Sequence, residues 1–114
     1  HKAGKAQEAD RYYTAILKAN PKHPDANHNM GVLAVGVSKV EAALPFFKAA
    51  LEANSNIAQY WLSYIDALIK LDRLADAKVV LDQAKNMVQT EMALTSLRKG
   101  LLGQKKRWKL TLLL

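Results

Sequence analysis

The feature that most constrains the fold of this chain is an internal repeat. Residues 9–21 read ADRYYTAILKANP, and residues 43–55 read ALPFFKAALEANS, so position 9 corresponds to position 43. The two segments share five identical positions, and each contains a pair of adjacent aromatic residues at the same place. A second shift by the same interval, which we call one period, carries Ala43 to Ala77. A period of about 34 residues is typical of a solenoid, in which each unit is too small to bury its own apolar face and stacks on its neighbours.

Apolar residues within each unit recur at the spacing of three and four that marks one face of an amphipathic helix. Pro21 and Pro24 cannot continue a first helix, so we expect a turn at about residues 20–23. The pattern predicts a single helix followed by two helical hairpins. The expected helices cover about residues 5–19, 24–35, 39–53, 57–70 and 74–87.

Several residues predict how these helices begin and end. Ser38 followed by Glu41 has the spacing of a capping box, so we expect Ser38 to start a helix. Gly36 just before it suits the left-handed end of the preceding helix. Asp72 is expected to cap its own helix as Ser38 does. Pro45 falls inside a predicted helix, where we expect a slight bend with the ring pointing outward.

The segment NHNMGVLAVGVSKVEAALPFFKAALEANS, residues 27–55, resembles the tetratricopeptide repeat (TPR), whose unit runs W, L-G, Y, A, F, A, P with the same period. Met30 and Gly31 fill the leucine-glycine pair. The later small, aromatic and small positions are filled by Ala43, Phe47 and Ala50.

The next unit matches the same pattern at Trp61, Ala77 and Ala84. It departs from the pattern at Tyr64 and Ile65, because Ile65 is larger than the glycine that permits the usual close contact. The first unit supplies only a second helix, with its matches at Ala9, Tyr13 and Pro21.

The resemblance implies an all-α fold, an antiparallel helix-hairpin stack of the TPR-type right-handed α-solenoid. The expected organisation is a half repeat (1–21), two repeats (24–57 and 58–90), a capping helix (91–103) and a basic-apolar tail (104–114).

For function, the resemblance implies protein binding, because proteins of this family hold an extended segment or a helix in the concave face made by the first helix of each unit. The positions that correspond to this groove are Asp25, His28, Asn29 and Val32, then Gln59, Leu62, Ser63 and Asp66, with Ile69 and Lys70 at the far edge. The plainer alternative is an ordinary solvated face. The chaperone-binding subtype is not expected, because Gln59 and Ser63 stand where its carboxylate clamp needs basic residues.

Catalytic and metal-binding chemistry is not predicted, so we expect neither an enzyme nor a cofactor. The chain has no cysteine, and His23 and His28 do not have the i, i+4 spacing of helical zinc ligands. The segment GVLAVGVS, residues 31–38, approaches a phosphate-binding loop, but Val37 replaces the lysine that such a loop requires. The outward acidic residues Asp72, Asp76 and Asp82 are interpreted as solubilising charge.

The formal charge of +7 is concentrated at the end of the sequence. Residues 1–90 hold 11 basic and 9 acidic residues, whereas residues 91–114 hold 6 basic residues and one acidic residue. The nearly balanced repeats are therefore not an electrostatic footprint for a polyanion, and membrane or nucleic-acid partners are not the first expectation. A small-molecule substrate is not expected either.

The tail leaves three alternatives open. Its basic residues surround a tryptophan and could contact an anionic membrane or nucleic-acid surface, so a targeting module is the alternative function. These tail-contact residues are Lys105, Lys106, Arg107, Trp108 and Lys109. The apolar end, residues 110–114, could instead cover an exposed face in this or another chain. The tail could also be an interrupted next domain or an artificial end that is not native to the chain.

Two further expectations concern the whole chain. We expect self-association, or further chain beyond the given sequence, because the first helix lacks a hairpin partner that would cover Tyr13, Ile16 and Leu17. No apolar run reaches the roughly 18 residues of a membrane-spanning helix, so the sequence predicts a soluble chain, cytoplasmic by default. Because it begins at His1 rather than methionine, we expect a fragment, a processed chain, or a chain numbered from its first ordered residue.

Overall fold

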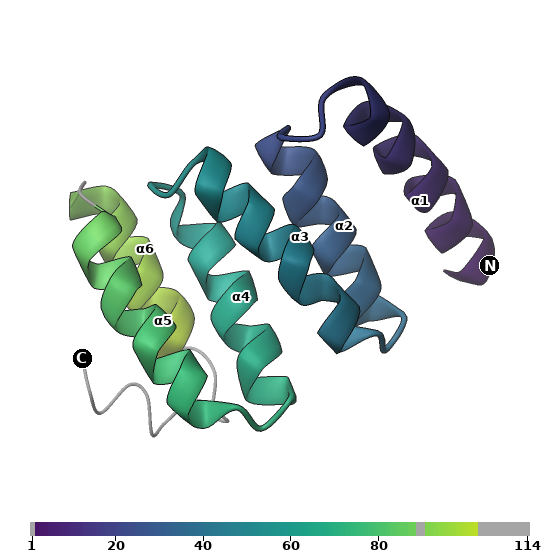
Figure 1. The fold of residues 1–114 in the computed structure, drawn as a ribbon. Helices are drawn as coiled ribbons and strands as arrows, with labels where there is room; N and C mark the ends of the chain where they lie inside the picture. Colours follow the sequence, from purple (N-terminus) through teal and green to yellow (C-terminus); the bar gives the residue numbers. More distant parts are fainter. Residues whose placement is uncertain (1, 89–90, 103–114) are drawn as a thin grey trace. The chain divides into compact units, whose positions relative to one another are not determined.

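The computed structural model describes residues 2–88 and 91–102, and all the regular structure within them is helical. The helices are α1 (Lys2–Ala19), α2 (Pro24–Gly36), α3 (Val40–Ala53), α4 (Ala58–Lys70), α5 (Leu74–Met87) and α6 (Glu91–Leu102) (Figure 1). The all-α prediction is therefore confirmed. No helix in these two ranges is both long and apolar enough to cross a membrane.

The chain divides into two compact units, His1–Asn54 and Ser55–Leu114. In the first unit α2 packs against both α1 and α3, and in the second α4 packs against both α5 and α6. Each unit therefore contains one antiparallel hairpin, α2–α3 or α4–α5, and one further helix (Figure 1).

The period of the sequence reappears in the bounds of the helices. The first helices of the two hairpins begin at Pro24 and Ala58, and the second helices begin at Val40 and Leu74, so each pair is separated by one period. The ends of these helices repeat at the same interval. The predicted hairpin helices are confirmed to within one residue at each end, whereas α1 begins three residues earlier than expected.

The turn inside each hairpin is built differently from the sequence prediction. Ser38 and Asp72 have left-handed backbones, with φ of 64° and 57°, so neither is the N-cap of the following helix. The N-caps of α3 and α5 are Lys39 and Arg73, and neither side chain makes a capping hydrogen bond. The predicted capping box at Ser38 and the predicted cap at Asp72 are both wrong.

These two turns are instead C-terminal caps of the preceding helices. In the first, the Ser38 N–H donates to the Val35 carbonyl (3.0 Å) and the Lys39 N–H donates to the Ala34 carbonyl (2.8 Å). This pattern is a Schellman motif, which satisfies the last carbonyls of α2. Gly36, which we expected to adopt the left-handed conformation, is the last residue of α2, and no described glycine has a positive φ.

The same motif closes α4. The Asp72 N–H donates to the Ile69 carbonyl (2.9 Å), and the Arg73 N–H donates to the Leu68 carbonyl (2.9 Å). Each hairpin thus reverses direction over three residues, 37–39 in the first and 71–73 in the second, which are one period apart. Pro45, inside α3, is exposed, as expected for a ring that points outward.

The core of the first unit depends on a close approach of α2 and α3. A Cβ atom added at Gly31 would lie 2.3 Å from Cε1 of Phe47, so only glycine fits there. The equivalent positions one period later are Ile65 and Leu81, which are both fully buried. The second hairpin therefore tolerates a larger residue at the glycine position because the facing aromatic ring is replaced by leucine.

A buried side-chain N–H holds the loop before each first helix. Asn27 Nδ2 donates to the carbonyls of Pro21 and His23, both at 3.0 Å. Trp61, one period later, donates from Nε1 to the Ser55 carbonyl at 2.7 Å. Pro21 and Ser55 are themselves one period apart, so two chemically different side chains make the same contact in the two units.

A helix, α6, occupies the segment where the sequence predicts a capping helix, and it lies against α4 in the second unit. A Cβ atom at Gly100 would lie 2.5 Å from Cδ1 of Leu62, so the two helices approach closely. The predicted end of this helix at residue 103 and the predicted tail, residues 104–114, lie outside the described residues.

Candidate functional site

The predicted groove residues of the first unit lie on α2, the helix that packs against both α1 and α3. Val32 and Asp25 are exposed, and His28 and Asn29 are half-buried. Their spacing of three and four residues puts them on one side of α2. Asp25 is the one charged residue of this helix. The side is therefore mainly uncharged, with an imidazole and an amide beside an exposed valine.

His28 is the most constrained of these residues. Its ring centroid lies 5.7 Å from that of Phe47 with the planes tilted by 44°. Burial lowers the pKa of the imidazole below its ordinary value of 6.5, and the hydrogen bond with the Asn29 side chain and the charge of Asp25 oppose this shift in part. The neutral form of His28, which carries both a donor and an acceptor, is therefore favoured at neutral pH.

His23, expected to be a simple loop residue, has a structural role. It is the N-cap of α2, and its Nδ1 accepts a hydrogen bond from the Ala26 N–H at 3.1 Å. Sequence reasoning missed this role because histidine is not among the preferred N-cap residues. The signal that could have revealed it is Pro24, since proline is favoured at the first helical position.

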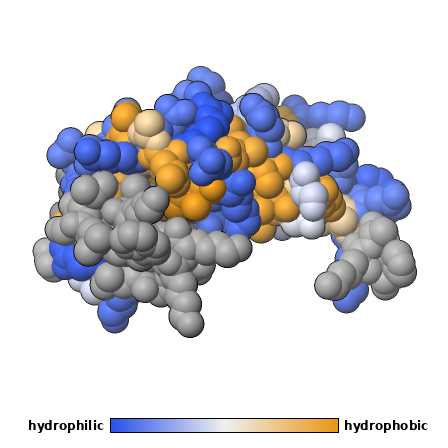
Figure 2. Space-filling model, turned by 90° about the horizontal axis from the view of Figure 1, so that it is seen from below, coloured by the Kyte–Doolittle hydropathy of each residue, from blue (hydrophilic) through white to orange (hydrophobic). Residues whose placement is uncertain are grey.

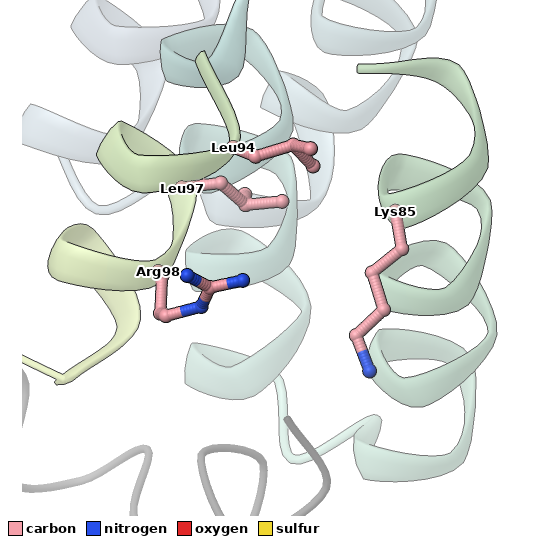
Figure 3. Close-up of a pocket in the computed structure, with 4 residues that line it drawn as sticks. All are labelled: Lys85, Leu94, Leu97 and Arg98. Carbon is pink, nitrogen blue, oxygen red and sulfur yellow. The ribbon is translucent and has the colours of Figure 1, made fainter. Parts of the chain in front are cut away.

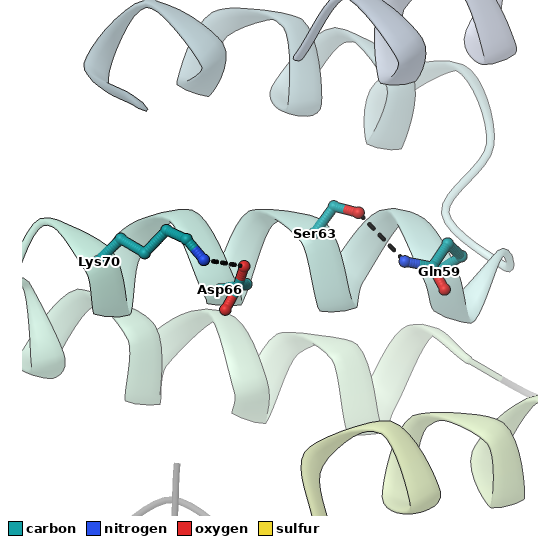
Figure 4. A network of polar contacts seen from close by, with 4 residues as sticks. All are labelled: Gln59, Ser63, Asp66 and Lys70. Atoms are coloured by element: carbon teal, nitrogen blue, oxygen red, sulfur yellow. Dashed lines mark hydrogen bonds and ion pairs between the residues drawn. The ribbon is translucent and has the colours of Figure 1, made fainter. Parts of the chain in front are cut away.

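The predicted groove residues of the second unit lie along α4 and form two bonded pairs (Figure 4). Gln59 Nε2 donates to Ser63 Oγ at 3.2 Å, and Lys70 Nζ pairs with Asp66 Oδ2 at 3.0 Å. Both pairs have an i, i+4 spacing, so the four side chains follow one stripe of the helix. The ion pair is partly exposed, and we expect it to contribute little to stability.

Two of the predicted residues of α4 are less accessible than expected. Leu62 is only 9% exposed and lies against Gly100 of α6, so its place is in the core of the second unit rather than on a binding face. Ile69 is half-buried. The resemblance to the tetratricopeptide repeat assigned Leu62 to the groove, but it could not show that α6 returns to cover that side of α4.

Hydrophobic side chains are also exposed between hydrophilic ones on the surface of the molecule (Figure 2). The more exposed of them include Val32 (47%) on α2, Val79 (57%) on α5 and Met92 (81%) on α6. Val32 thus has a counterpart of the same residue type on a helix that carries none of the predicted groove positions. This pair offers a matched comparison for the binding experiments below.

Metal-binding and phosphate-binding sites find no support in the described part of the chain. Within residues 2–88 and 91–102, no three His, Cys, Asp or Glu side chains come together as metal ligands. Gly31, the start of the loop-like segment GVLAVGVS, lies inside α2, which agrees with the rejection of a phosphate-binding loop. The predicted tail-contact residues 105–109 lie outside the described residues.

The structure also contains a cavity between α5 and α6 that the sequence did not predict. It is lined by Lys85, Leu94, Leu97 and Arg98 (Figure 3). The sequence indicated only that the residues of α6 would close the last hairpin, and no spacing rule connects Lys85 with residues on a different helix.

Comparisons with known proteins give no family for this chain. No protein-family model matches the sequence, and no curated protein matches it. Function is therefore inferred from the repeat and from the faces of α2 and α4.

Proposed function

We propose that the chain is a non-catalytic protein-interaction scaffold whose helices belong to a TPR-type right-handed α-solenoid. The faces of α2 and α4 that carry the predicted groove residues would bind a peptide or helix of a partner protein. The observation that carries this proposal is the scarcity of charge on these two helices. Asp25 is the one charged residue of α2, and Asp66 and Lys70, which pair with each other, are the two of α4.

This composition suits recognition of a peptide backbone. Asn29 and Gln59 carry side-chain amides, and each amide can both donate and accept a hydrogen bond, as a peptide group does. Uncharged groups also lose less hydration energy than ions when a ligand covers them. Val32, one helical turn after Asn29 on α2, adds an exposed apolar contact. A peptide that lies along α4 would compete with the exposed hydrogen bond between Gln59 and Ser63. Exchanging this bond for hydrogen bonds to the peptide would cost little free energy.

The proposal is tested by selecting peptides from a random displayed library against the whole chain, and by measuring their affinity for two matched variants. Val32→Glu places a charge on the proposed face of α2, and Val79→Glu makes the same change at an exposed position of α5. We expect Val32→Glu to weaken binding by about tenfold or more and Val79→Glu to leave it unchanged. Thermal unfolding of both variants verifies that each is folded.

The outcome that contradicts the proposal is equally specific. If selected peptides bind the Val32→Glu variant as well as they bind the unchanged chain, the face of α2 is not the binding surface. Failure to select any peptide that binds the folded chain also counts against a peptide-binding scaffold. A second measurement, the chemical shift changes of backbone amides on adding a selected peptide, should be largest in α2 and α4.

A further inference from the structure

The cavity between α5 and α6 has an apolar wall and basic side chains. Lys85 comes from α5, and the three other lining residues come from α6 (Figure 3). Leu97 is only 2% exposed and Leu94 is half-buried, so the leucines form the protected part. Arg98 is exposed and Lys85 is half-buried. The cavity arises because α5 and α6 both pack on α4, which leaves space between them.

The size and charge of the cavity limit what it can hold. Its volume is about 250 Å³, below the roughly 300–1,000 Å³ typical of sites for drug-sized ligands. Among the described residues that line it, two are cations and none is an acid. A guanidinium can form two parallel hydrogen bonds with a carboxylate, and an ammonium adds a point charge. The two leucines favour an aliphatic group next to that carboxylate.

We propose that this cavity binds a carboxylate carried on a short aliphatic chain. The leucine side chains contact the chain, and Arg98 and Lys85 bind the carboxylate. Two sources have this chemistry: a medium-chain fatty acid and a leucine-type residue with a free carboxyl group. None of the described lining residues lies on α2 or α4, so the proposal does not depend on the proposed scaffold function.

The test uses small probes and the whole chain, followed by nuclear magnetic resonance of the backbone amides. Octanoate, octanol and octylamine share one aliphatic chain and differ in the end group, and N-acetylleucine represents the end of a peptide. We expect octanoate to bind at least about tenfold more tightly than octanol or octylamine. Its shift changes should centre on Lys85, Leu94, Leu97 and Arg98. N-acetylleucine binding as tightly as octanoate would support the site and indicate the peptide source, whereas tighter octanoate binding would support the site and indicate the fatty acid.

Charge reversal gives the sharper test. The double variant Lys85→Glu with Arg98→Glu should lose octanoate binding by at least about tenfold and should bind octylamine more tightly than the unchanged chain does. The control double variant, Lys78→Glu with Lys99→Glu, changes the net charge equally on the same two helices, but neither residue lines the cavity. It should retain octanoate binding. If the reversed variant does not fold, Lys85→Gln with Arg98→Gln replaces it, and the loss of octanoate binding is still expected.

Three results would overturn the proposal. Octanol binding as tightly as octanoate would show that the cations do not select the ligand. Equal losses in the reversed and control variants would show a general effect of charge rather than a site. Shift changes centred away from the lining residues, or no octanoate binding at millimolar concentration, would show that the cavity does not take this ligand.

Discussion

At the scale of single residues, the ring of Phe47 lies against two residues of α2. Gly31 leaves room for the ring, because a Cβ atom there would lie 2.3 Å from Cε1 of Phe47. His28 lies beside the same ring, with a centroid distance of 5.7 Å. A position at the proposed binding face is thus directly coupled to the packing of the hairpin. Changes at Gly31 should therefore affect the stability of the unit and the surroundings of His28.

Replacement of Gly31 by alanine should reduce the free energy of unfolding by about 1–3 kcal/mol, because the new methyl group overpacks the contact with Phe47. The Gly36→Ala variant is the control, since nothing lies within 4 Å of a Cβ atom at Gly36. That variant should be neutral or slightly stabilising. Urea unfolding of both variants measures the difference.

Adding Phe47→Leu to Gly31→Ala should recover part of the lost stability. In the second hairpin the residues one period after Phe47 and Gly31 are Leu81 and Ile65, so a leucine accompanies the larger residue there. Strict additivity of the two substitutions would contradict the proposed complementarity of these residues.

The second prediction at this scale concerns protonation of His28. Because burial lowers its pKa in the folded state, the unfolded chain takes up a proton at a higher pH than the folded chain does. Stability should therefore be highest above the unfolded pKa of about 6.5 and should decrease as the pH falls below it, until the folded state is protonated as well. The His28→Gln variant should show a weaker decrease. Chemical shifts of the imidazole protons give the pKa directly, and a value above 6.5 would contradict this account.

At the scale of elements, the two hairpin turns are the most informative feature. Ser38 and Asp72 occupy equivalent positions, one period apart, and both have the left-handed backbone that glycine adopts without steric cost. For a residue with a Cβ atom, this conformation costs roughly 1–2 kcal/mol. Both turns therefore contain a strained backbone conformation. The packing of the two helices of each hairpin holds the turn in that conformation.

Substitution of glycine at either turn should relieve this strain. We expect Ser38→Gly to raise the free energy of unfolding by about 0.5–1 kcal/mol, after allowance for the greater freedom of glycine in the unfolded chain. The gain at Asp72→Gly should be smaller, because aspartate tolerates the left-handed region better than serine does. Urea unfolding midpoints measure both changes.

The neighbouring residues provide the controls for these turns. Lys39 and Arg73 have negative φ angles, of −108° and −96°, so glycine at either position relieves no strain. Lys39→Gly and Arg73→Gly should therefore leave stability unchanged or lower it. Stabilisation by these control variants as large as that of Ser38→Gly would show that the left-handed conformation is not the cause.

At the scale of the whole molecule, the main prediction concerns self-association. Tyr13, Ile16 and Leu17 of α1 remain half-buried although α1 packs against α2. Tyr12, beside them, is 64% exposed. The first unit therefore presents apolar surface on α1 that a second copy of the chain could cover, which is the physical basis for the self-association that we propose.

Sedimentation of the chain at several concentrations and at two salt concentrations tests this proposal. We expect a dimer whose population rises with protein concentration and is insensitive to salt, because apolar contacts are not screened by ions. A chain that ends at Gly103 tests whether residues 104–114 are needed for association. A monomer at every concentration would refute the proposal, and strong weakening by salt would indicate a charge-driven contact instead.

The sequence by itself determined the positions of the helices. The apolar spacing of three and four residues and the prolines at positions 21 and 24 are local signals, so the bounds of the hairpin helices followed to within one residue. The predicted groove positions on α2 came from the resemblance to the tetratricopeptide repeat, and their helical spacing puts them on one face. Whether they bind a peptide is a separate question, which the proposed experiments address.

Only the tertiary structure decided how the turns and faces are used. Serine and aspartate are common both at helix N-caps and in turns, so the sequence could not show that Ser38 and Asp72 close the preceding helices. The resemblance to the tetratricopeptide repeat places Leu62 in a groove, but the return of α6 to α4 buries it. The cavity at Lys85 and Arg98 likewise exists only because two helices pack on a third. The pattern of apolar residues in the sequence predicts one face of a single helix. Whether that face is buried depends on which other helix packs against it.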